Sequence, residues 1–286
     1  MMVLKTKTKI ALARIAYNII MGFRQFIGLN SVVIVKRRGI TWKLDLSEGI
    51  DFAIYLGGIY ELKTIRAYRK LVKSGYAVVD IGSNIGVHTL YLAKCVGTMG
   101  RVISIEPTDF AFRKLKTNVS LNPGLAQNIS IIQAMLVADK NKNVKTSLYS
   151  SWPLNRHDGE VHPIHGGRLK EAHNAQRATL DDIIQQIGVK NIDFIKIDVD
   201  GNECDVFKGA INTLRKYRPK IVMELAPYVF DETDASLEEL LSILDILKYR
   251  ILNQHLNKVL PSDADYLRSI IPVGSGINVI AYPVDE

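Results

Sequence analysis

The sequence predicts an α/β fold built on a doubly wound, Rossmann-like parallel sheet, preceded by an N-terminal helix and a β-hairpin. Two observations carry this prediction. From about residue 77, apolar strand-like runs alternate with helix-like runs, which favours parallel strands with helices on both faces. The first of these strands leads through a glycine-containing turn into an apolar helix, VVDIGSNIGVHTLYLA, as ligand-binding turns of such sheets do.

The net charge of +8 is concentrated at the N-terminus. Residues 1–44 hold nine Lys and Arg and no Asp or Glu, which leaves 28 bases against 29 acids in the remainder. Because the main body is nearly neutral, the charge argues against a basic nucleic-acid cleft, and we expect no nucleic-acid partner. We predict two parts: residues 1–44, a basic amphipathic helix and the start of the hairpin, and residues 45–286, the α/β domain.

Residues 9–28, KIALARIAYNIIMGFRQFIG, predict an amphipathic helix. Arg14 and Arg24 interrupt the apolar run, which argues against a transmembrane span and a signal peptide. Two roles stay open for the helix. It packs on the domain or on a second subunit of a homo-oligomer, or residues 5–28 contact an anionic membrane surface from a cytoplasmic location. The residues at helical spacing are Leu12, Ile15, Ile19, Phe23 and Phe26.

The remaining elements follow in order along the chain. Residues 31–47 predict a hairpin that turns at Arg38-Gly39, and residues 59–72 predict a helix. Residues 256–276 show no clear crossover helix, so we predict that the last strand is antiparallel. Cys95 and Cys204 fall in different predicted helices, and we expect no disulfide. Strands are expected at 77–82, 101–106, 129–136, 194–199, 220–226, 249–254 and 277–283, and helices at 85–95, 109–121, 179–187, 203–216 and 235–247.

The turn after the first strand predicts a nucleoside cofactor. Gly82 and Gly86 permit a tight bend, and Asn84 tolerates a left-handed backbone. Glu106 ends the second strand 20 residues after Gly86, where a carboxylate can accept hydrogen bonds from ribose hydroxyls. Asp80 would repel a pyrophosphate but suits a ligand with positive charge, such as S-adenosylmethionine. The alternatives are an NAD-dependent oxidoreductase, which would favour a third glycine, and a non-catalytic binding module.

Four motifs in order make the chain resemble the FkbM-type S-adenosylmethionine-dependent methyltransferases. They are VVDIGSNIGVHTLYLA, VISIEP, IDFIKIDVDGNECDVFKGA and RPKIVMEL. Ser83 replaces the alanine of the family's Asp-x-Gly-Ala-Asn-x-Gly, and Asp200 replaces the glutamate of its Asp-Val-Glu-Gly. The resemblance implies the methyltransferase version of the doubly wound sheet, with a reversed last strand. It also implies methylation of oxygen, often on sugar or polyketide hydroxyls.

The resemblance further implies which residues hold the cofactor. The first turn would wrap its methionine and ribose portions, and the end of the third strand would flank its adenine. His88 and Thr89 begin a helix whose N-terminus faces the cofactor carboxylate. Glu61 matches a family position that closes over the cofactor. The expected set is Glu61, Asp80, Gly82, Ser83, Asn84, Gly86, His88, Thr89, Glu106, Pro107, Ala134, Met135 and Asp198.

Methyl transfer to a hydroxyl requires a group that removes its proton. Asp198 and Asp200 follow one predicted central strand and Glu224 ends the next, so three carboxylates should meet at the mouth of the site. They suit a general base or, as the less favoured reading, a divalent cation. Alternatively, Asp198 binds backbone amides and Asp200 caps the helix that begins near Glu203. The expected catalytic residues are Asp198, His157, Asp200 and Glu224.

The irregular stretch between Leu148 and Ala178 predicts the acceptor site. Loops of this length in compact domains are usually functional or disordered. His162 and His165 have His-x-x-His spacing, which alone is weak evidence for a metal. The expected substrate residues are Trp152, Asn155, Arg156, His157, His162 and His165, although Trp152 could equally be a packing residue. The predicted function is S-adenosylmethionine-dependent O-methylation of a sugar, glycan or related small-molecule hydroxyl, with another acceptor atom as the alternative.

Overall fold

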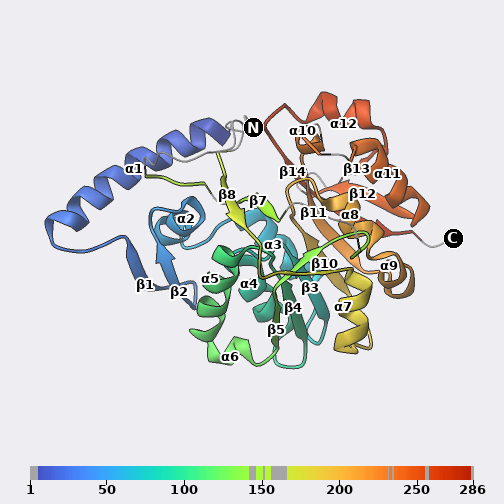
Figure 1. The fold of residues 1–286 in the computed structure, drawn as a ribbon, viewed down its shortest axis with the longest axis horizontal. Helices are drawn as coiled ribbons and strands as arrows, with labels where there is room; N and C mark the ends of the chain where they lie inside the picture. The colour runs from blue at the N-terminus through green and yellow to red at the C-terminus, as the bar shows by residue number, and fades with distance from the viewer. Residues whose placement is uncertain are drawn as a thin grey trace.

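The structure is a computed structural model that describes residues 6–141, 146–150, 152–155, 166–230, 232–233, 235–254 and 258–284. Its centre is an eight-stranded sheet with the strand order β13-β12-β14-β11-β10-β3-β4-β5 (Figure 1). The strands are β3 (Ala77–Ile81), β4 (Arg101–Ile105), β5 (Ile129–Ile132), β10 (Phe194–Ile197), β11 (Lys220–Leu225), β12 (Tyr249–Asn253), β13 (Lys258–Leu260) and β14 (Ile277–Pro283).

The direction of the last strand agrees with the prediction. Strands β3, β4, β5, β10 and β11 are parallel to one another, whereas β14 is antiparallel to both β11 and β12. The predicted doubly wound sheet with a reversed last strand is therefore confirmed. The connection before β14 contains β13 and a seven-residue helix, α12 (Ala264–Ile270), which is too short to show two turns of periodicity in the sequence.

Helices and smaller elements cover both faces of the sheet. One face carries α7 (Leu180–Ile187), α8 (Glu203–Lys208), α9 (Ile211–Tyr217), α11 (Leu237–Ile246) and α12, and the other carries α3 (Leu62–Leu71), α4 (Val87–Val96) and α5 (Asp109–Ser120). Smaller elements are α6 (Pro123–Ala126), α10 (Pro227–Phe230), the pair β6 (Ala134–Leu136) and β9 (Gln176–Ala178), and the pair β7 (Ser147–Ser150) and β8 (Arg168–Glu171).

Two predicted elements are interrupted. The expected strand 129–136 ends at Ile132 because the Gln133 carbonyl accepts the Gln176 amide, and the chain then pairs with β9 instead of β4. The expected helix 203–216 breaks at Gly209. A Cβ there would lie 2.3 Å from the Val137 carbonyl oxygen, so glycine permits a close approach that a continuous helix of larger residues would prevent.

The N-terminal elements pack against the α3–α4 face. They are α1 (Thr6–Phe26), the predicted hairpin of β1 (Val32–Arg37) and β2 (Ile40–Asp45), and α2 (Gly49–Gly57). Trp42 of β2 and Tyr17 of α1 belong to the same buried cluster as Leu90 of α4, so residues on both sides of the predicted boundary at position 44 share one core. The division into two parts remains a prediction.

Helix α1 is present as predicted, but its apolar stripe does not pack on the domain. Tyr17 and Met21 face inward, and the Tyr17 ring meets Phe52 edge-on with 5.8 Å between ring centroids. The predicted stripe lies on a different side of the helix and is exposed. The helix therefore packs on the domain, which is one of its two predicted roles, but it does so through Tyr17 and Met21 and not through this stripe. None of the described helices is long and apolar enough to cross a membrane.

Candidate active site

A ladder of polar residues crosses three central strands at their carboxyl ends. The register pairs Asp80 of β3 with Lys196 of β10 on one side and with Ser104 of β4 on the other. All three residues are buried, and Asp80 has no exposed surface. Because paired residues on neighbouring strands project to the same face, the ladder lies under α3 and α4.

Two neighbouring side chains contact the Asp80 carboxylate, but one of its two oxygens accepts no hydrogen bond from the described residues. The Thr89 hydroxyl donates to Oδ2 over 2.6 Å, and Lys196 Nζ lies 3.6 Å from Oδ1. Oδ1 has no hydrogen-bond partner among the described residues. A buried carboxylate oxygen without a donor is costly, so this atom is available to a ligand that donates a hydrogen bond.

Lys196 is one of the residues at the site that sequence reasoning missed. Its Nζ donates to the Gly82 carbonyl over 3.1 Å and lies 3.3 Å from Asp198 Oδ2. Burial alone would lower the pKa of Lys196, but the carboxylates of Asp198 and Asp80 outweigh it and raise the pKa. The ammonium therefore stays charged. The available signal was a lysine inside an otherwise apolar buried strand, FIKI.

The turn after β3 has the backbone that its sequence predicts. Asn84 is left-handed with a φ of 48°, as expected. Gly82 has a φ of +73°, and a Cβ there would lie 1.9 Å from the Asp198 carbonyl oxygen. Gly86, with a φ of +93°, precedes α4. The Ser83 hydroxyl donates to the Asp80 carbonyl over 2.8 Å, so this buried side chain holds the turn in place.

Glu106 fixes the turn to the end of β4. Its Oε2 accepts the Asn84 amide over 2.9 Å, and its Oε1 accepts the Thr108 amide and hydroxyl over 2.9 and 2.6 Å. Burial raises the pKa of Glu106, against the lowering effect of these hydrogen bonds. A carboxylate offers about four acceptor positions, which leaves one for a ligand. Pro107 follows and is half-buried.

Four carboxyl groups lie near one another above the ladder and are here called the carboxyl rim: Glu61, Asp198, Asp200 and Glu224. The pKa of Glu224 lies well above its ordinary value because of burial and then the charges of Asp198 and Asp200. Burial and the Asp198 charge also raise the pKa of Glu61. A Cβ at Gly276 would lie 2.1 Å from Glu224 Oε1, so glycine at this position leaves room for the carboxylate.

Asp200 lies at the mouth of the site. It is exposed and has a left-handed backbone with a φ of 48°. Desolvation, followed by the charges of Asp198 and Glu203, raises the pKa of Asp200 to about 8. Asn202, not Asp200, is the N-cap residue of α8. The alternative that Asp200 caps this helix is wrong.

Two phenols share the environment of these carboxyls, and sequence reasoning did not find them. Burial, followed by the charges of Glu61 and Asp198, raises the pKa of Tyr60 well above its ordinary value. Burial and the Glu224 charge likewise raise the pKa of Tyr228. Both phenols therefore keep their protons at neutral pH and can donate hydrogen bonds at the rim.

His88 is buried in the first turn of α4 and serves the site indirectly. Its Nδ1 lies 2.7 Å from the Tyr68 hydroxyl, and its Nε2 lies 3.6 Å from Glu61 Oε2. Burial and then the Lys196 charge lower the pKa of His88 well below its ordinary value. The neutral ring connects α4 to the start of α3, where Glu61 has a left-handed backbone.

Residues 80–251 match the model of the methyltransferase FkbM domain. This range covers more than half of the chain and contains the ladder, the turn and most of the carboxyl rim. The chain belongs to the FkbM methyltransferase family.

Relatives of this FkbM domain include Methyltransferase 1 of Beauveria bassiana, which is 25% identical over 165 residues, 52% of this chain and 64% of that protein. Methyltransferase sdnD of Sordaria araneosa is 24% identical over 157 residues, 46% of this chain and 59% of that protein. The matched segment thus spans less than two thirds of either relative. The crystal structure of the methyltransferase FkbM from Methylobacillus flagellatus is 16% identical with a TM-score of 0.43, covering 76% of this chain and 50% of that one.

The structure also shows the surroundings of several residues predicted to contact the adenine and the acceptor. Ala134 and Met135 are buried in β6. The Trp152 ring packs on Gly49, where a Cβ would lie 2.0 Å from it. The Asn155 Oδ1 accepts the Arg168 guanidinium over 3.3 Å, in a hollow that also includes Tyr17 and Glu48. Arg156, His157, His162 and His165 lie outside the described residues.

The carboxyl rim also bears on the metal interpretation. Among the residues that the structure describes, no group of three or more His, Cys, Asp or Glu side chains is arranged to hold a metal ion. Asp198 uses Oδ2 to pair with Lys196, so its side chain does more than bind neighbouring backbone amides. The arrangement supports proton transfer and the binding of a cation-bearing organic ligand.

Proposed function

We propose that this FkbM domain is an S-adenosylmethionine-dependent O-methyltransferase that acts on a hydroxyl of a sugar, glycan or related small molecule. The observation that carries the proposal is the crowding of Glu61, Asp198, Asp200 and Glu224, three of which have a raised pKa. Like charges at close quarters destabilise their ionised forms. A ligand with its own positive charge relieves that repulsion, and S-adenosylmethionine carries a sulfonium and an amino group.

The residues present fit this cofactor. Asp80 has a buried oxygen without a donor, and Glu106 keeps acceptor capacity beside the turn. Gly82 and Gly86 have backbone conformations that favour glycine, which keeps the turn open to close approach of a ligand. These residues, with the N-terminus of α4, would hold the cofactor. When bound, it would supply an electrophilic methyl group.

The carboxyl rim would supply the base that removes the proton of the acceptor hydroxyl. An acceptor hydroxyl needs a base, and a catalytic base works best with a pKa near the operating pH. Asp200, with a pKa of about 8, meets that condition, and a bound cation would lower its pKa toward neutrality. The same cation would also lower the raised pKa of Glu224. Lys196 positions the Asp198 carboxylate between the turn and the rim. The protonated phenols of Tyr60 and Tyr228 would orient the acceptor oxygen by donating to it.

Oxygen as the acceptor atom and a sugar-type acceptor are supported by the family resemblance and by a base at the rim. The described loop residues add little to this point, because Trp152 packs on Gly49 and Asn155 binds Arg168. His157, the remaining catalytic candidate, keeps its predicted role as a proposal. We favour Asp200 and Glu224 as bases, with Asp198 as their charged neighbour.

Calorimetric titration with S-adenosylhomocysteine and with NAD tests the cofactor. We expect S-adenosylhomocysteine alone to bind, with affinity reduced at least about tenfold in Asp80→Asn because a charged hydrogen bond is lost. Asp245→Asn, which removes an exposed carboxylate of α11, should bind as the wild type does. Binding of NAD in place of S-adenosylhomocysteine, or of neither, would overturn the cofactor assignment.

Transfer of labelled methyl groups to a panel of hydroxylated acceptors tests the reaction. Nuclear magnetic resonance of the product then locates the methyl group. A methyl on oxygen supports the proposal. A methyl on nitrogen or carbon would retain the cofactor and replace the acceptor class, and cofactor binding with no transfer to any acceptor would favour a non-catalytic binding module.

A further inference from the structure

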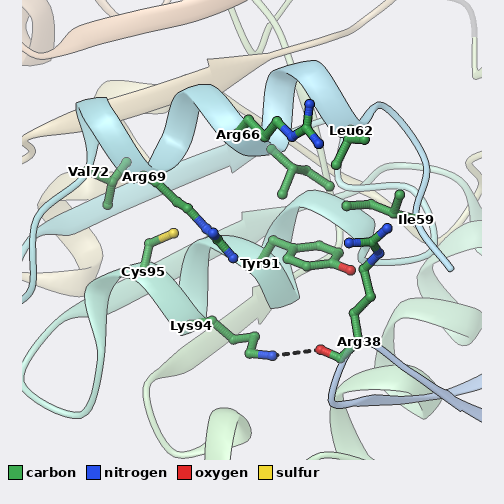
Figure 2. A pocket seen from close by; sticks show the side chains of 10 residues that line it. Arg38, Ile59, Leu62, Arg66, Arg69, Val72, Tyr91, Lys94 and Cys95 are labelled. Carbon is green, nitrogen blue, oxygen red and sulfur yellow. Dashed lines mark hydrogen bonds between the residues drawn. The ribbon is translucent and has the colours of Figure 1, made fainter.

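A polar pocket lies beside α3 and α4. It encloses about 550 Å³ between these helices and the β1–β2 turn (Figure 2). The floor is apolar, with Ile59, Leu62, Ile65, Val72 and Cys95, and the other lining residues are Arg38, Arg66, Arg69, Tyr91 and Lys94. Four of the ten lining residues are cationic and none is acidic, so the pocket favours an anion.

The cations of this pocket have few partners of their own. Lys94 Nζ donates to the Arg38 carbonyl over 2.9 Å, which joins α4 to the hairpin turn. Within the described part of the chain, the guanidinium groups of Arg38, Arg66 and Arg69 take part in no ion pair. These three exposed arginines line one hollow, and guanidinium groups are suited to bidentate binding of phosphate or carboxylate oxygens.

Tyr91 gives independent evidence for a ligand. The residue is 9% exposed, and its hydroxyl has no hydrogen-bond partner among the described residues. Figure 2 shows the ring in the middle of the pocket with the hydroxyl turned toward Arg38. Buried hydroxyls are nearly always paired. A ligand oxygen between Tyr91 and Arg38 would supply the missing acceptor.

We propose that this pocket binds a phosphate ester that carries an apolar body. The phosphate contacts Arg38, Arg66, Arg69 and the Tyr91 hydroxyl, and the apolar body lies on Ile59, Leu62 and Ile65. The volume suits a small organic molecule. The proposal does not depend on the proposed function, although Leu62 directly follows Glu61, whose Oε2 lies 3.6 Å from His88 Nε2.

Titration with hexyl phosphate, hexanol and inorganic phosphate tests the pocket. Hexyl phosphate should bind, hexanol should not, and inorganic phosphate should bind more weakly because it lacks the apolar body. Arg66→Gln/Arg69→Gln should weaken hexyl phosphate binding at least about tenfold, since two charged contacts are lost. The control Lys63→Gln/Lys70→Gln removes the same charge from exposed positions of α3 outside the pocket, and should change binding less than about twofold.

Tyr91→Phe separates a ligand contact from a structural role. Removing an unpartnered buried hydroxyl should leave the thermal midpoint unchanged or raised, while hexyl phosphate binding falls several-fold. Equal losses in both double variants, or no binding of hexyl phosphate to the wild type, would overturn the proposal. Glycerol 3-phosphate and dihexanoyl phosphatidic acid then distinguish the source: tighter binding of the first indicates a free metabolite, and tighter binding of the second a lipid headgroup.

A separate observation concerns the outer side of α1. The stripe formed by Leu12, Ile15, Ile19, Phe23 and Phe26 is between 56% and 87% exposed. Ile27 and Leu29 continue the exposed apolar surface beyond the helix. Figure 1 shows α1 at the edge of the molecule, with the turn after it reaching far from the sheet. Scattered exposed apolar residues are ordinary, but a contiguous stripe marks an interaction surface.

The positive charge of residues 1–44 favours an anionic partner for the stripe over a second copy of the chain. Residues 1–44 hold nine bases and no acid, and Lys36 and Lys43 are exposed. A second copy of the chain would bring two basic segments together with no acid in either segment to offset them, which is unfavourable. An anionic lipid surface matches both the apolar stripe and the charge. We infer that α1 lies on an anionic membrane surface through this stripe.

Vesicle flotation tests this surface. The wild type should float with vesicles of phosphatidylcholine and phosphatidylserine and much less with phosphatidylcholine alone. Ile19→Glu/Phe23→Glu should lower the bound fraction at least about tenfold, because two apolar side chains no longer enter the lipid. The control Met99→Glu/Val273→Glu changes two other exposed apolar residues, each 84% exposed, and should float as the wild type does.

Two outcomes would overturn the membrane inference. One is equal flotation of the wild type and Ile19→Glu/Phe23→Glu, or flotation of neither. The other is a dimer of the wild type in solution that Ile19→Glu/Phe23→Glu converts to a monomer without any vesicle binding, which would assign the stripe to a second copy of the chain.

Discussion

The two faces of the central sheet are lined by alternate residues of the same strands, and, among the strands that the structure describes, only one face carries buried charged residues at the candidate site. On one face, Val79 and Ile81 of β3 pack under α7 to α12 in an apolar cluster. On the other face, β3 begins with Val78 and then presents Asp80, flanked by Ser104 and Lys196. Because alternate residues of a strand face opposite sides, the same strands build a core on one face and a buried ionic ladder on the other.

The buried charges on one face of the sheet cost stability and are explained by function. Buried charges cost several kcal/mol each unless they are paired, and the apolar face shows that these strands can be filled with Ile and Val. The ladder lies at the carboxyl ends of the strands, where open α/β sheets bind ligands. The charges are therefore placed where they can act on a ligand.

The largest effect should follow Lys196→Met. Asp80, which has no exposed surface, would lose its counter-charge, and the free energy of unfolding should fall by about 3–5 kcal/mol. Urea denaturation measures the loss. Lys196→Met/Asp80→Asn removes both charges and should recover most of it. A single variant within about 1 kcal/mol of the wild type would show that the ladder contributes no coupled charge pair.

Gly82→Ala should have the next largest effect. The added Cβ would lie 1.9 Å from the Asp198 carbonyl oxygen at a φ of +73°, so strain and overlap should lower the free energy of unfolding by roughly 3 kcal/mol. S-adenosylhomocysteine binding should fall with it. Gly124→Ala in α6 is the matched control, since its Cβ meets nothing within 4 Å. Equal thermal midpoints for the two variants would contradict the packing described for the turn.

Glu203→Gln tests the electrostatics of the rim through pH. Burial raises the pKa of Glu203 to about 7, so the stability contributed by its protonated form is complete below about pH 4.5 and is lost as pH rises through about 7. Glutamine cannot ionise. The variant should gain about 3 kcal/mol in unfolding free energy over the wild type between about pH 4.5 and pH 8. If the free energies of unfolding of the two proteins changed with pH in parallel, ionisation of Glu203 would not destabilise the folded protein.

The smallest effect should come from Gly22→Ala, far from the ladder. A Cβ at Gly22 in α1 meets nothing within 4 Å, and alanine favours a helix over glycine by about 1 kcal/mol. Thermal unfolding should show a slightly raised midpoint. A lowered midpoint would mean that α1 packs more closely at this position than the structure shows.

Much of the fold follows from the sequence. The alternation of strands and helices predicted the parallel sheet, since apolar periodicity reports burial directly. The reversed last strand was predicted from the lack of a clear crossover helix before it and from the family resemblance. The left-handed Asn84 was also predictable, because few residue types tolerate that backbone. The breaks at Gln133 and Gly209 were not, because each depends on a contact with a segment distant in the sequence.

The candidate site was predictable only in part. Asp80, Asp198 and Glu224 end strands, and strand ends meet at one edge of a parallel sheet. Lys196, Tyr60 and Tyr228 were missed because their importance arises from which carboxyls surround them in space. The side of α1 that packs on the domain was not predictable either, because periodicity identifies an apolar face without saying what covers it.

The most direct test of the account compares the affinity of S-adenosylmethionine with that of S-adenosylhomocysteine at about pH 6 and about pH 8.5. The two ligands differ in the sulfonium charge. As the carboxyl of Asp200, whose pKa is raised to about 8, ionises over this range, attraction for the sulfonium increases. The preference for S-adenosylmethionine over S-adenosylhomocysteine should grow several-fold at the higher pH. A preference that stays constant or declines would contradict the claim that the rim is built for a cationic cofactor.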